Sequence, residues 1–224
     1  MGGMKGVLDE AHSRILMQNL GAFAGIQGGL LSAAENREVR SILITSCNRG
    51  EGKTVAATGM AYTLAGHANA DVLLMDGNFS APALHTIFGV PRDPGLSDYL
   101  TSDIALDEVV CPTAVSRLLL MPCGRAVTTQ FDITRSDTFT KQLASLKSKF
   151  DFMICDGSSV FGSSDASLVA GFFDGVVLVV ECERTRWEVV RDAKERLTKA
   201  GGKILGVALN KRRYYIPKAL YAGG

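Results

Sequence analysis

The chain has 224 residues, of which 46% are hydrophobic and 21% are charged, and its formal net charge is +1. These proportions are those of an ordinary globular protein with enough chain to bury a core. A net charge this small excludes a general electrostatic attraction of the whole protein to nucleic acid or to a membrane surface. We therefore expect no nucleic-acid partner.

The cysteine pattern and the lengths of the apolar runs indicate in which cellular compartment the protein is expected. The five cysteines form no CxxC pair and have no histidine at ligand spacing, so a zinc or iron–sulfur site is not expected. An odd number of cysteines without a secretory signal favours free thiols in a reducing cytosol. The longest apolar run, residues 175–180, has the length of a strand and not of a membrane span. We expect a cytoplasmic protein.

The first half of the chain alternates predicted helices and short strands. Residues 9–31 are predicted to form a helix, because Ile15, Leu16, Leu20 and Phe23 recur at helical spacing. After a polar break at 35–40, we expect a strand at 41–46, a helix at 53–66, a strand at 72–75, and short helices at 82–88 and 96–100.

The second half continues the same alternation. We expect strands at 118–121, 152–155, 176–181 and 204–209, and helices at 137–149, 166–170 and 186–200. Strands that are apolar on both faces are typical of a parallel sheet that helices cover on both sides. The predicted fold class is therefore α/β, with three layers (αβα) and a mostly parallel central sheet.

The whole chain, 1–224, is predicted to be a single domain. Residues 1–40 would form its N-terminal helix and linker, and residues 211–224 a basic tail that contains tyrosines. In such a sheet, ligands gather at the carboxyl ends of the strands. Four polar residues fall there: Ser46, Asp76, Asp156 and Asn210.

The segment TSCNRGEGKT connects a predicted strand to a predicted helix, which is the context that a P-loop requires. In a P-loop, backbone N–H groups and the helix N-terminus cradle phosphate oxygens. Lys53 would neutralise phosphate charge, and the Thr54 hydroxyl would bind Mg²⁺. A strict P-loop has glycine where Cys47 stands, so the alternative is a glycine-rich turn that merely joins strand to helix. The residues expected to contact nucleotide are Cys47, Asn48, Arg49, Gly50, Glu51, Gly52, Lys53, Thr54 and Val55.

Two aspartates each follow an apolar strand, in VLLMD and FMICD. At those places, Asp76 and Asp156 can reach Mg²⁺ or a water bound to it, as a Walker B residue does. A single aspartate after a strand is more often a turn or helix cap. Their occurrence alongside a P-loop favours the metal-directed role. With this motif, the predicted fold is a three-layer αβα P-loop NTPase, and residues 1–224 are predicted to form a single P-loop ATPase or kinase domain.

Several segments of the chain together resemble one protein family. They are SCNRGEGKT, VLLMDGNFSAPALHTIFG, PGLSDYL, DFMICDGSS, VVLVVECERTRWEVVRDA and KILGVALNKRRYY. They are similar to segments of the bacterial tyrosine kinases of capsule and exopolysaccharide synthesis. These kinases are MinD/ParA-type ATPases that phosphorylate protein, and the resemblance covers nearly the whole chain.

The resemblance implies ATP and Mg²⁺ as cofactors and assigns a role to each matched residue. Lys53 and Thr54 would bind phosphates and Mg²⁺, and Asp156 would hold Mg²⁺ through water. Asp76 would bind Mg²⁺ or orient and deprotonate the acceptor tyrosine, and Asn210 would contact the adenine base. The candidate autophosphorylation sites are Tyr214, Tyr215 and Tyr221, although tyrosines packed on the edge of the domain are an equal alternative.

Several departures from the family pattern fall on phosphoryl transfer and ring assembly. The second acidic residue of the DxD segment is Asn78, which stays among the candidate catalytic residues with Lys53, Asp76 and Asp156. An amide can orient a hydroxyl or a water but cannot act as a carboxylate base. Other departures are Ser80 in place of an arginine, Gly157-Ser158-Ser159 in place of TPP, residues 126–135 in place of PNPxELL, and Arg14 as the only residue left of ExxRxxR.

The resemblance also implies a transmembrane activator of the polysaccharide co-polymerase type, a homo-oligomer, and a location at the inner face of the cell membrane through that partner. Three alternatives remain open. One is a MinD/ParA-like switch ATPase, and another is a catalytically degenerate, nucleotide-binding regulatory subunit of a polysaccharide export assembly. The third is an adaptor that binds anionic lipid through basic residues of 211–218.

Overall fold

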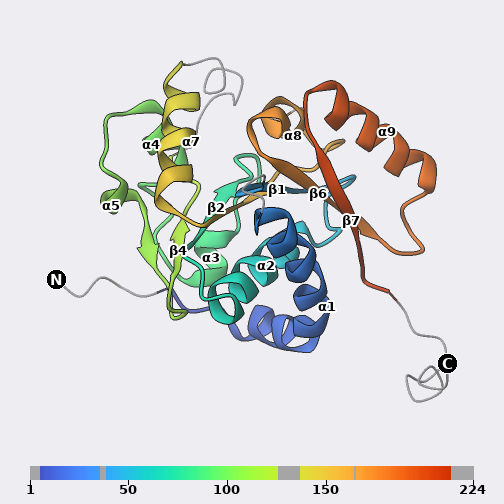
Figure 1. Ribbon diagram of the computed structural model, residues 1–224, viewed down its shortest axis with the longest axis horizontal. Coiled ribbons are helices and arrows are strands. Elements are labelled where there is room, and N and C mark those ends of the chain that lie inside the picture. Colours follow the sequence, from blue (N-terminus) through green and yellow to red (C-terminus); the bar gives the residue numbers. More distant parts are fainter. Residues whose placement is uncertain (1–5, 36–38, 126–136, 164, 213–224) are drawn as a thin grey trace.

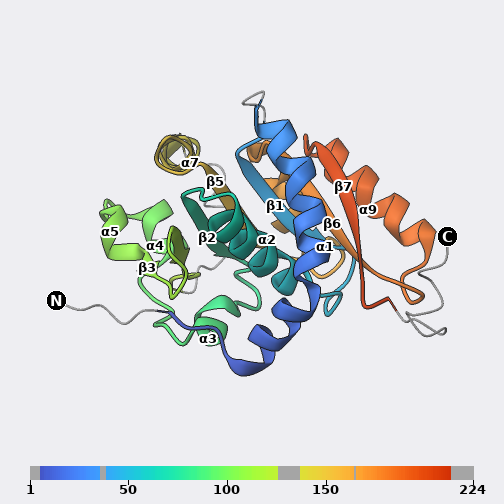
Figure 2. The ribbon, with the colours of Figure 1, turned by 60° about the horizontal axis from the view of Figure 1, so that its bottom comes forward.

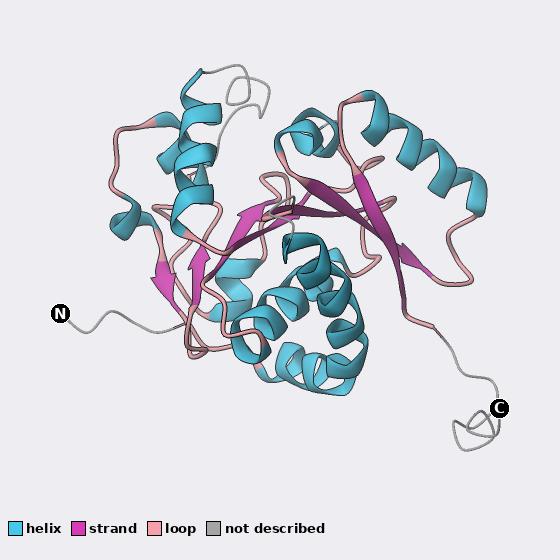
Figure 3. Cartoon of the chain, in the orientation of Figure 1, coloured by secondary structure: helices cyan, strands magenta, loops and turns pink. Residues whose placement is uncertain are grey.

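The computed structural model describes residues 6–35, 39–125, 137–163 and 165–212. A seven-stranded sheet in the order β3-β4-β2-β5-β1-β6-β7 runs through the molecule, with helices on both of its faces (Figure 3). The pairs within it are parallel except that β3 pairs antiparallel with β4. The strands are β1 (Ser41–Ser46), β2 (Val72–Gly77), β3 (Cys111–Pro112), β4 (Leu118–Met121), β5 (Phe152–Gly157), β6 (Gly175–Glu181) and β7 (Ile204–Asn210).

Helices α1 and α2 lie together on one face of the sheet, and α4, α7, α8 and α9 lie on the other (Figures 1 and 2). Phe23 of α1 packs so closely on α2 that a Cβ atom at Gly59 would lie 2.4 Å from its ring. The helices are α1 (Glu10–Glu35), α2 (Lys53–His67), α3 (Leu84–Phe88), α4 (Leu96–Thr101), α5 (Leu106–Val109), α7 (Asp137–Lys149), α8 (Asp165–Val169) and α9 (Trp187–Lys199), with a 3₁₀ turn at Ala170–Phe172. In the described part of the chain, no helix is both long and apolar enough to cross a membrane.

Alternate side chains of each central strand enter the two halves of the core. On β1, Ile42 and Ile44 join the cluster beneath α1 and α2, whereas Leu43 joins the cluster on the opposite face. All six residues of β1, β2 and β5 are buried, as expected for strands that helices cover on both sides. The predicted three-layer α/β architecture is confirmed.

The predicted elements are found, but their boundaries and two small elements differ. The helix expected from residue 82 begins at Leu84, because Asp76 caps its first free N–H groups. Strands β2 and β5 extend to Gly77 and Gly157, one residue beyond each aspartate. Helix α5 and strand β3 were not predicted, because four and two residues are too short for a periodic pattern.

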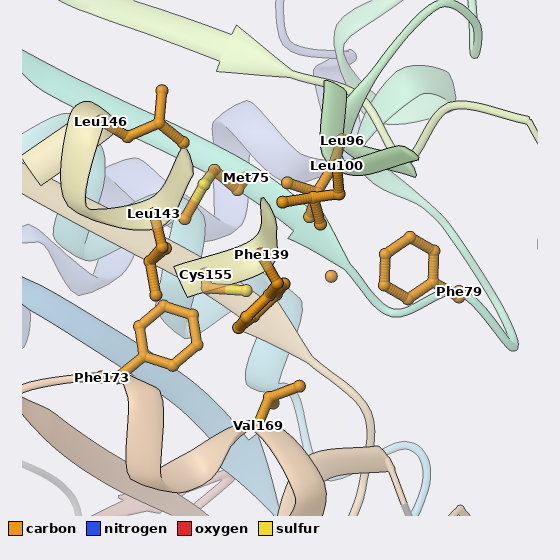
Figure 4. A pocket seen from close by; sticks show the side chains of 11 residues that line it. Met75, Phe79, Leu96, Leu100, Phe139, Leu143, Leu146, Cys155, Val169 and Phe173 are labelled. Atoms are coloured by element: carbon orange, nitrogen blue, oxygen red, sulfur yellow. The ribbon is translucent and has the colours of Figure 1, made fainter. Parts of the chain in front are cut away.

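An apolar cavity of about 30 Å³ lies beside the carboxyl ends of β2 and β5, under α4, α7 and α8 (Figure 4). Met75 and Cys155, which are register partners on neighbouring strands, line it from the sheet. Phe139 lines it from α7 and packs edge-on against Phe172, with ring centroids 4.7 Å apart. The other lining residues are Gly77, Phe79, Leu96, Leu100, Leu143, Leu146, Val169 and Phe173.

Candidate active site

The predicted P-loop lies at the carboxyl end of β1, the strand between β5 and β6, and leads into α2. Gly50 and Gly52 have φ angles of 83° and 94°, in the left-handed region that favours glycine. A Cβ atom on Gly52 would also lie 2.0 Å from the amide nitrogen of Asn210. The sequence therefore needs both glycines to wrap the backbone at this place.

A polar pocket of about 190 Å³ lies between the P-loop and the loops that follow β2 and β5. It gathers five of the predicted site residues: Arg49, Gly50, Lys53, Thr54 and Asn78. The rest of its wall is small or carries hydroxyl groups, namely Ser80, Ala81, Ser158, Ser159, Gly162 and Ser163.

Gly162 and Ser163 were not anticipated, although the run of small residues directly after β5 is a signal that could have identified them. A Cβ atom at Gly162 would lie 2.2 Å from Ser159 Oγ and 3.2 Å from the side chain of Arg49. Glycine at this position thus lets the loop after β5 approach the P-loop closely. The wall of the pocket depends on that approach.

Lys53 lines this pocket and faces Asp156, which, like Asp76, is buried and does not itself line the pocket. The Lys53 Nζ lies 3.9 Å from Asp156 Oδ1, and the two side chains are 13% and 0% exposed. Both Asp156 oxygens are buried and make no hydrogen bond of normal geometry within the described residues, although the Thr54 hydroxyl is near enough to oppose the rise in the pKa of this carboxyl. Burial raises the pKa of Asp156 to about 7, against the opposing effect of Lys53, and the nearby Asp76 raises it further.

A buried carboxylate with free oxygens fits a site for Mg²⁺, which prefers oxygen ligands. The Thr54 hydroxyl, at the same pocket, is a second oxygen of the kind required. Among the described residues there is no cluster of three or more histidine, cysteine, aspartate or glutamate side chains that could hold a metal alone. Mg²⁺ would thus have to share its ligands with phosphate oxygens and water, as it usually does at nucleotide sites.

Asp76 is the register partner of Asp156 on the neighbouring strand, but its environment is different. Its Oδ2 accepts hydrogen bonds from the backbone N–H groups of Ala83 and Leu84, both at 2.9 Å. Its Oδ1 accepts one from the N–H of Asn78 at 3.2 Å. Burial raises the pKa of Asp76, and these three bonds oppose the increase. Asp76 therefore caps α3 and fixes the loop between β2 and that helix.

Asn78 holds a fixed place in the wall of the pocket. Its Oδ1 accepts a hydrogen bond from Ser158 Oγ at 3.1 Å, and its Nδ2 donates to the Ala81 carbonyl at 2.7 Å. Asn78 and Ser158 are thus directly coupled, although the sequence places them 80 residues apart.

Several predicted contact residues do not line the polar pocket. The Cys47 side chain is buried in the core cluster on the α4, α7 and α9 face, where burial raises the pKa of its thiol to about 12. Asn48, Glu51 and Asn210 belong to a hydrogen-bond network on the other side of the loop. Val55 lies half-buried in the first turn of α2.

The candidate acceptor tyrosines Tyr214, Tyr215 and Tyr221 lie outside the described residues, as does segment 126–135. All five cysteines are free, and Cys47, Cys123 and Cys155 are buried.

Curated proteins that are at least 30% identical to this chain include the following two. The chain is 31% identical over 189 residues to the putative tyrosine-protein kinase CapB of Staphylococcus aureus, which covers 84% of this chain and 82% of CapB. It is 32% identical over 176 residues to the tyrosine-protein kinase CpsD of Streptococcus agalactiae, which covers 78% of this chain and 76% of CpsD. No protein-family model matches the chain.

Solved structures agree with this relationship. The kinase domain of VpsO superposes with a TM-score of 0.80 at 27% identity, over 92% of this chain and 100% of that one. The chimerical protein CapA2B2 gives 0.79 at 30% identity, over 86% and 84%. MinD of Pyrococcus horikoshii, solved with Mg-ADP, gives 0.63 at 26% identity, over 81% and 75%. With this P-loop, this sheet order and these relatives, the chain belongs to the bacterial tyrosine kinase family of MinD/ParA-type P-loop ATPases.

Proposed function

We propose that the chain is an ATP-dependent protein-tyrosine kinase that phosphorylates tyrosines of its own C-terminal segment and regulates capsular or exopolysaccharide synthesis and export. The observation that carries the proposal is the pair of Lys53 and the buried, unsatisfied Asp156 beside a glycine-built phosphate loop. The relatives named tyrosine-protein kinases support the assignment of the reaction.

ATP would bind with its phosphates along the loop between Cys47 and Lys53. Backbone N–H groups of the loop and the N-terminus of α2 supply partial positive charge there. Lys53 and Arg49, which both line the pocket, would add two full positive charges. These groups would stabilise the charge that spreads over the γ-phosphate oxygens during transfer.

Mg²⁺ would be held by the Thr54 hydroxyl and by Asp156, directly or through water. When bound, it would withdraw charge from the phosphate oxygens and fix their orientation. Asp156 has to lose its proton to serve, and Lys53 at 3.9 Å favours the ionised form.

In the transfer step, the bond between the γ-phosphorus of ATP and the oxygen that links it to the β-phosphate breaks while a bond to the tyrosine oxygen forms. ADP leaves, and the phenolic proton passes to solvent water. Such transfers depend more on positioning and charge stabilisation than on a strong base. We propose that Asn78, held by Ser158 and Ala81, orients the acceptor hydroxyl at the pocket wall. Asp76 would act on the acceptor chiefly by fixing the loop that carries Asn78, since three N–H groups already occupy most of the acceptor positions of a carboxylate.

A homo-oligomer and a transmembrane activator of the polysaccharide co-polymerase type would complete the system. The resemblance of the sequence to capsule and exopolysaccharide kinases supports this part of the proposal. The similarity to the chimerical protein CapA2B2 is compatible with a kinase that works in association with a partner. The partner would bring the chain to the inner face of the cell membrane.

A second candidate function is a nucleotide-binding switch or regulatory subunit that does not phosphorylate protein. Asn78 favours it, because an amide stands where the family places a carboxylate, and Asp76 is committed to backbone N–H groups. ATP binding is common to both candidates, so only the fate of the γ-phosphate separates them.

Intact-mass spectrometry and phosphate release, measured together after incubation with Mg-ATP, test the choice. A kinase gains phosphoryl mass, and this gain disappears when Tyr214, Tyr215 and Tyr221 are changed together to phenylalanine. Phosphate release without a mass gain supports the switch ATPase and contradicts the kinase. Bound ATP with neither signal supports the regulatory subunit. Lys53→Met is the control and should abolish every signal.

A further inference from the structure

The P-loop is hydrogen-bonded on its outer side to the chain that follows β6 and β7. Thr185 comes from the turn after β6, and Asn210 and Lys211 come from the end of β7. These residues lie more than 130 positions from the loop in sequence, and none of them lines the polar pocket. We call the three residues the outer latch.

The first part of the latch acts through the side chain of Glu51. This carboxylate is only 2% exposed although it belongs to a loop. It accepts hydrogen bonds from the Asn48 backbone N–H at 2.9 Å and from the Asn48 side-chain amide at 3.3 Å. The Thr185 hydroxyl donates a further, short hydrogen bond to it. Glu51 therefore stabilises the loop by hydrogen bonds within it, and Thr185 connects Glu51 to the turn after β6.

The second part of the latch holds two backbone carbonyls of the loop. The Lys211 Nζ donates to the Gly50 carbonyl at 2.6 Å, and the Asn210 Nδ2 donates to the Glu51 carbonyl at 2.8 Å. Lys211 also contacts Glu181 Oε2 at 3.1 Å, which fixes the position of its ammonium group.

The planarity of the peptide bond connects these contacts to the phosphate site. In a trans peptide, the carbonyl of one residue and the N–H of the next point in opposite directions. A donor that holds the Gly50 carbonyl outward turns the N–H of Glu51 toward the other side. Asn210 does the same for the peptide between Glu51 and Gly52. Hydrogen bonds to the loop carbonyls on the outer side thus orient the loop N–H groups toward the side where a phosphate would bind.

We propose that Thr185 and Lys211 are positioning residues that set the affinity for ATP by holding the P-loop in its phosphate-binding conformation. The inference rests on the proposed ATP site and adds to it a control point outside the pocket. Lys211 is also the first residue after β7, and the candidate acceptor tyrosines begin three residues beyond it. The latch therefore joins the nucleotide loop directly to the segment that is proposed to be phosphorylated.

Matched variants of Thr185 test the proposal. Thr185→Val keeps the shape of the side chain and removes the hydroxyl, whereas Thr185→Ser keeps the hydroxyl and removes the methyl group. We expect Thr185→Val to raise the Kd for Mg-ATP about five- to tenfold, the effect of one lost hydrogen bond, with Thr185→Ser close to wild type. Lys211→Met should raise the Kd by at least as much. Calorimetric titration measures these Kd values. The rate of phosphoryl transfer or ATP hydrolysis at saturating ATP should change less than about twofold.

The outcomes separate this inference from the proposed function. Wild-type protein that does not bind Mg-ATP overturns both. Wild-type binding with an unchanged Kd in Thr185→Val and Lys211→Met overturns the latch alone. A loss in Thr185→Val that Thr185→Ser fails to restore also overturns it, because packing of the methyl group would then be responsible. Thr185→Val could also lower the Tm so far that part of the nucleotide-free protein is unfolded during the titration. If this unfolded fraction accounts for the whole loss of affinity, the latch is overturned as well.

Discussion

Two regions of the molecule use the same pair of strands in opposite ways. Met75 and Cys155 line an apolar cavity under α4, α7 and α8 (Figure 4). Asp76 and Asp156, the next residue on each strand, lie at the edge that carries the polar pocket. Because side chains alternate between the faces of a strand, one residue step changes the environment completely. The apolar side provides stability, and the polar side provides chemistry.

The polar side is not optimised for stability. Asp156 is fully buried, and its oxygens make no hydrogen bond of normal geometry among the described residues, an arrangement that destabilises a folded protein. The apolar side has only a small void, about 30 Å³, among well-packed side chains. Perturbing each side should therefore affect a different measurement: ligand affinity for the polar side and thermal stability for the apolar side.

The largest effect on affinity is expected from Lys53→Met. The change removes a full positive charge at the phosphates, and we expect the Kd for Mg-ATP to rise at least about 100-fold. At pH 6, below the pKa of Asp156, the Tm of the nucleotide-free protein should change little, because the carboxyl is mostly protonated and does not need the Lys53 charge, whereas above pH 7 the Tm should fall. Calorimetry and a thermal melt on the same sample provide both numbers. If Lys53→Met binds Mg-ATP as tightly as wild type does, the phosphates do not bind beside Lys53.

On the apolar side, Leu146→Ala is expected to give the opposite pattern, a large loss of stability with little change in the affinity for Mg-ATP. Leu146 is fully buried and lines the cavity, so its truncation should lower the free energy of unfolding by about 2–5 kcal/mol. The Tm should fall by roughly 5–15 °C for a chain of this size. The Kd for Mg-ATP, measured well below the new Tm, should stay within about twofold. A matching loss of affinity would mean that the two regions are not independent.

The pH dependence of stability should carry the signature of Asp156. Its pKa is raised from the ordinary value of 3.8 to about 7 by burial, so the native state holds a proton that the unfolded chain releases. The contribution of this group to the free energy of unfolding must therefore fall as pH rises from about 4 to about 7. Denaturant unfolding of nucleotide-free protein across that range measures the slope. For Leu146→Ala, the free energy of unfolding should be lower at every pH but should fall with the same slope. For Asp156→Asn, the part of the slope that comes from Asp156 should be absent.

The smallest effect is expected from filling the apolar cavity. Val169 is half-buried at its wall, and Val169→Ile adds one methylene group toward the void. We expect a gain of about 0.5–1 kcal/mol in the free energy of unfolding and unchanged ATP affinity. A thermal melt detects the change. Lower stability would show that the void cannot accept a methylene group without strain.

Local patterns in the sequence were sufficient to predict the layers of the fold and the centre of the site. The P-loop glycines, Lys53 and the two aspartates each carry a signal within about ten residues, and the parallel sheet brings them to one edge. The helix cap that Asp76 makes stood in the sequence analysis only as the alternative to a metal-directed role, because the choice depends on where the chain returns seven residues later. Thr185 could not be assigned a role either, since nothing near it in sequence indicates that the turn after β6 would meet Glu51.

The comparison of the two regions depends on one claim, that the buried Asp156 oxygens lack hydrogen bonds of normal geometry because bound Mg-ATP supplies their partners. The most direct measurement is the Tm of wild type and Asp156→Asn at pH 8, each with and without Mg-ATP. We predict that Asp156→Asn is more stable than wild type without ligand, because an amide removes a buried negative charge. We also predict that Mg-ATP raises the Tm of wild type far more than that of the variant. Equal stabilisation of both proteins by Mg-ATP would contradict the claim.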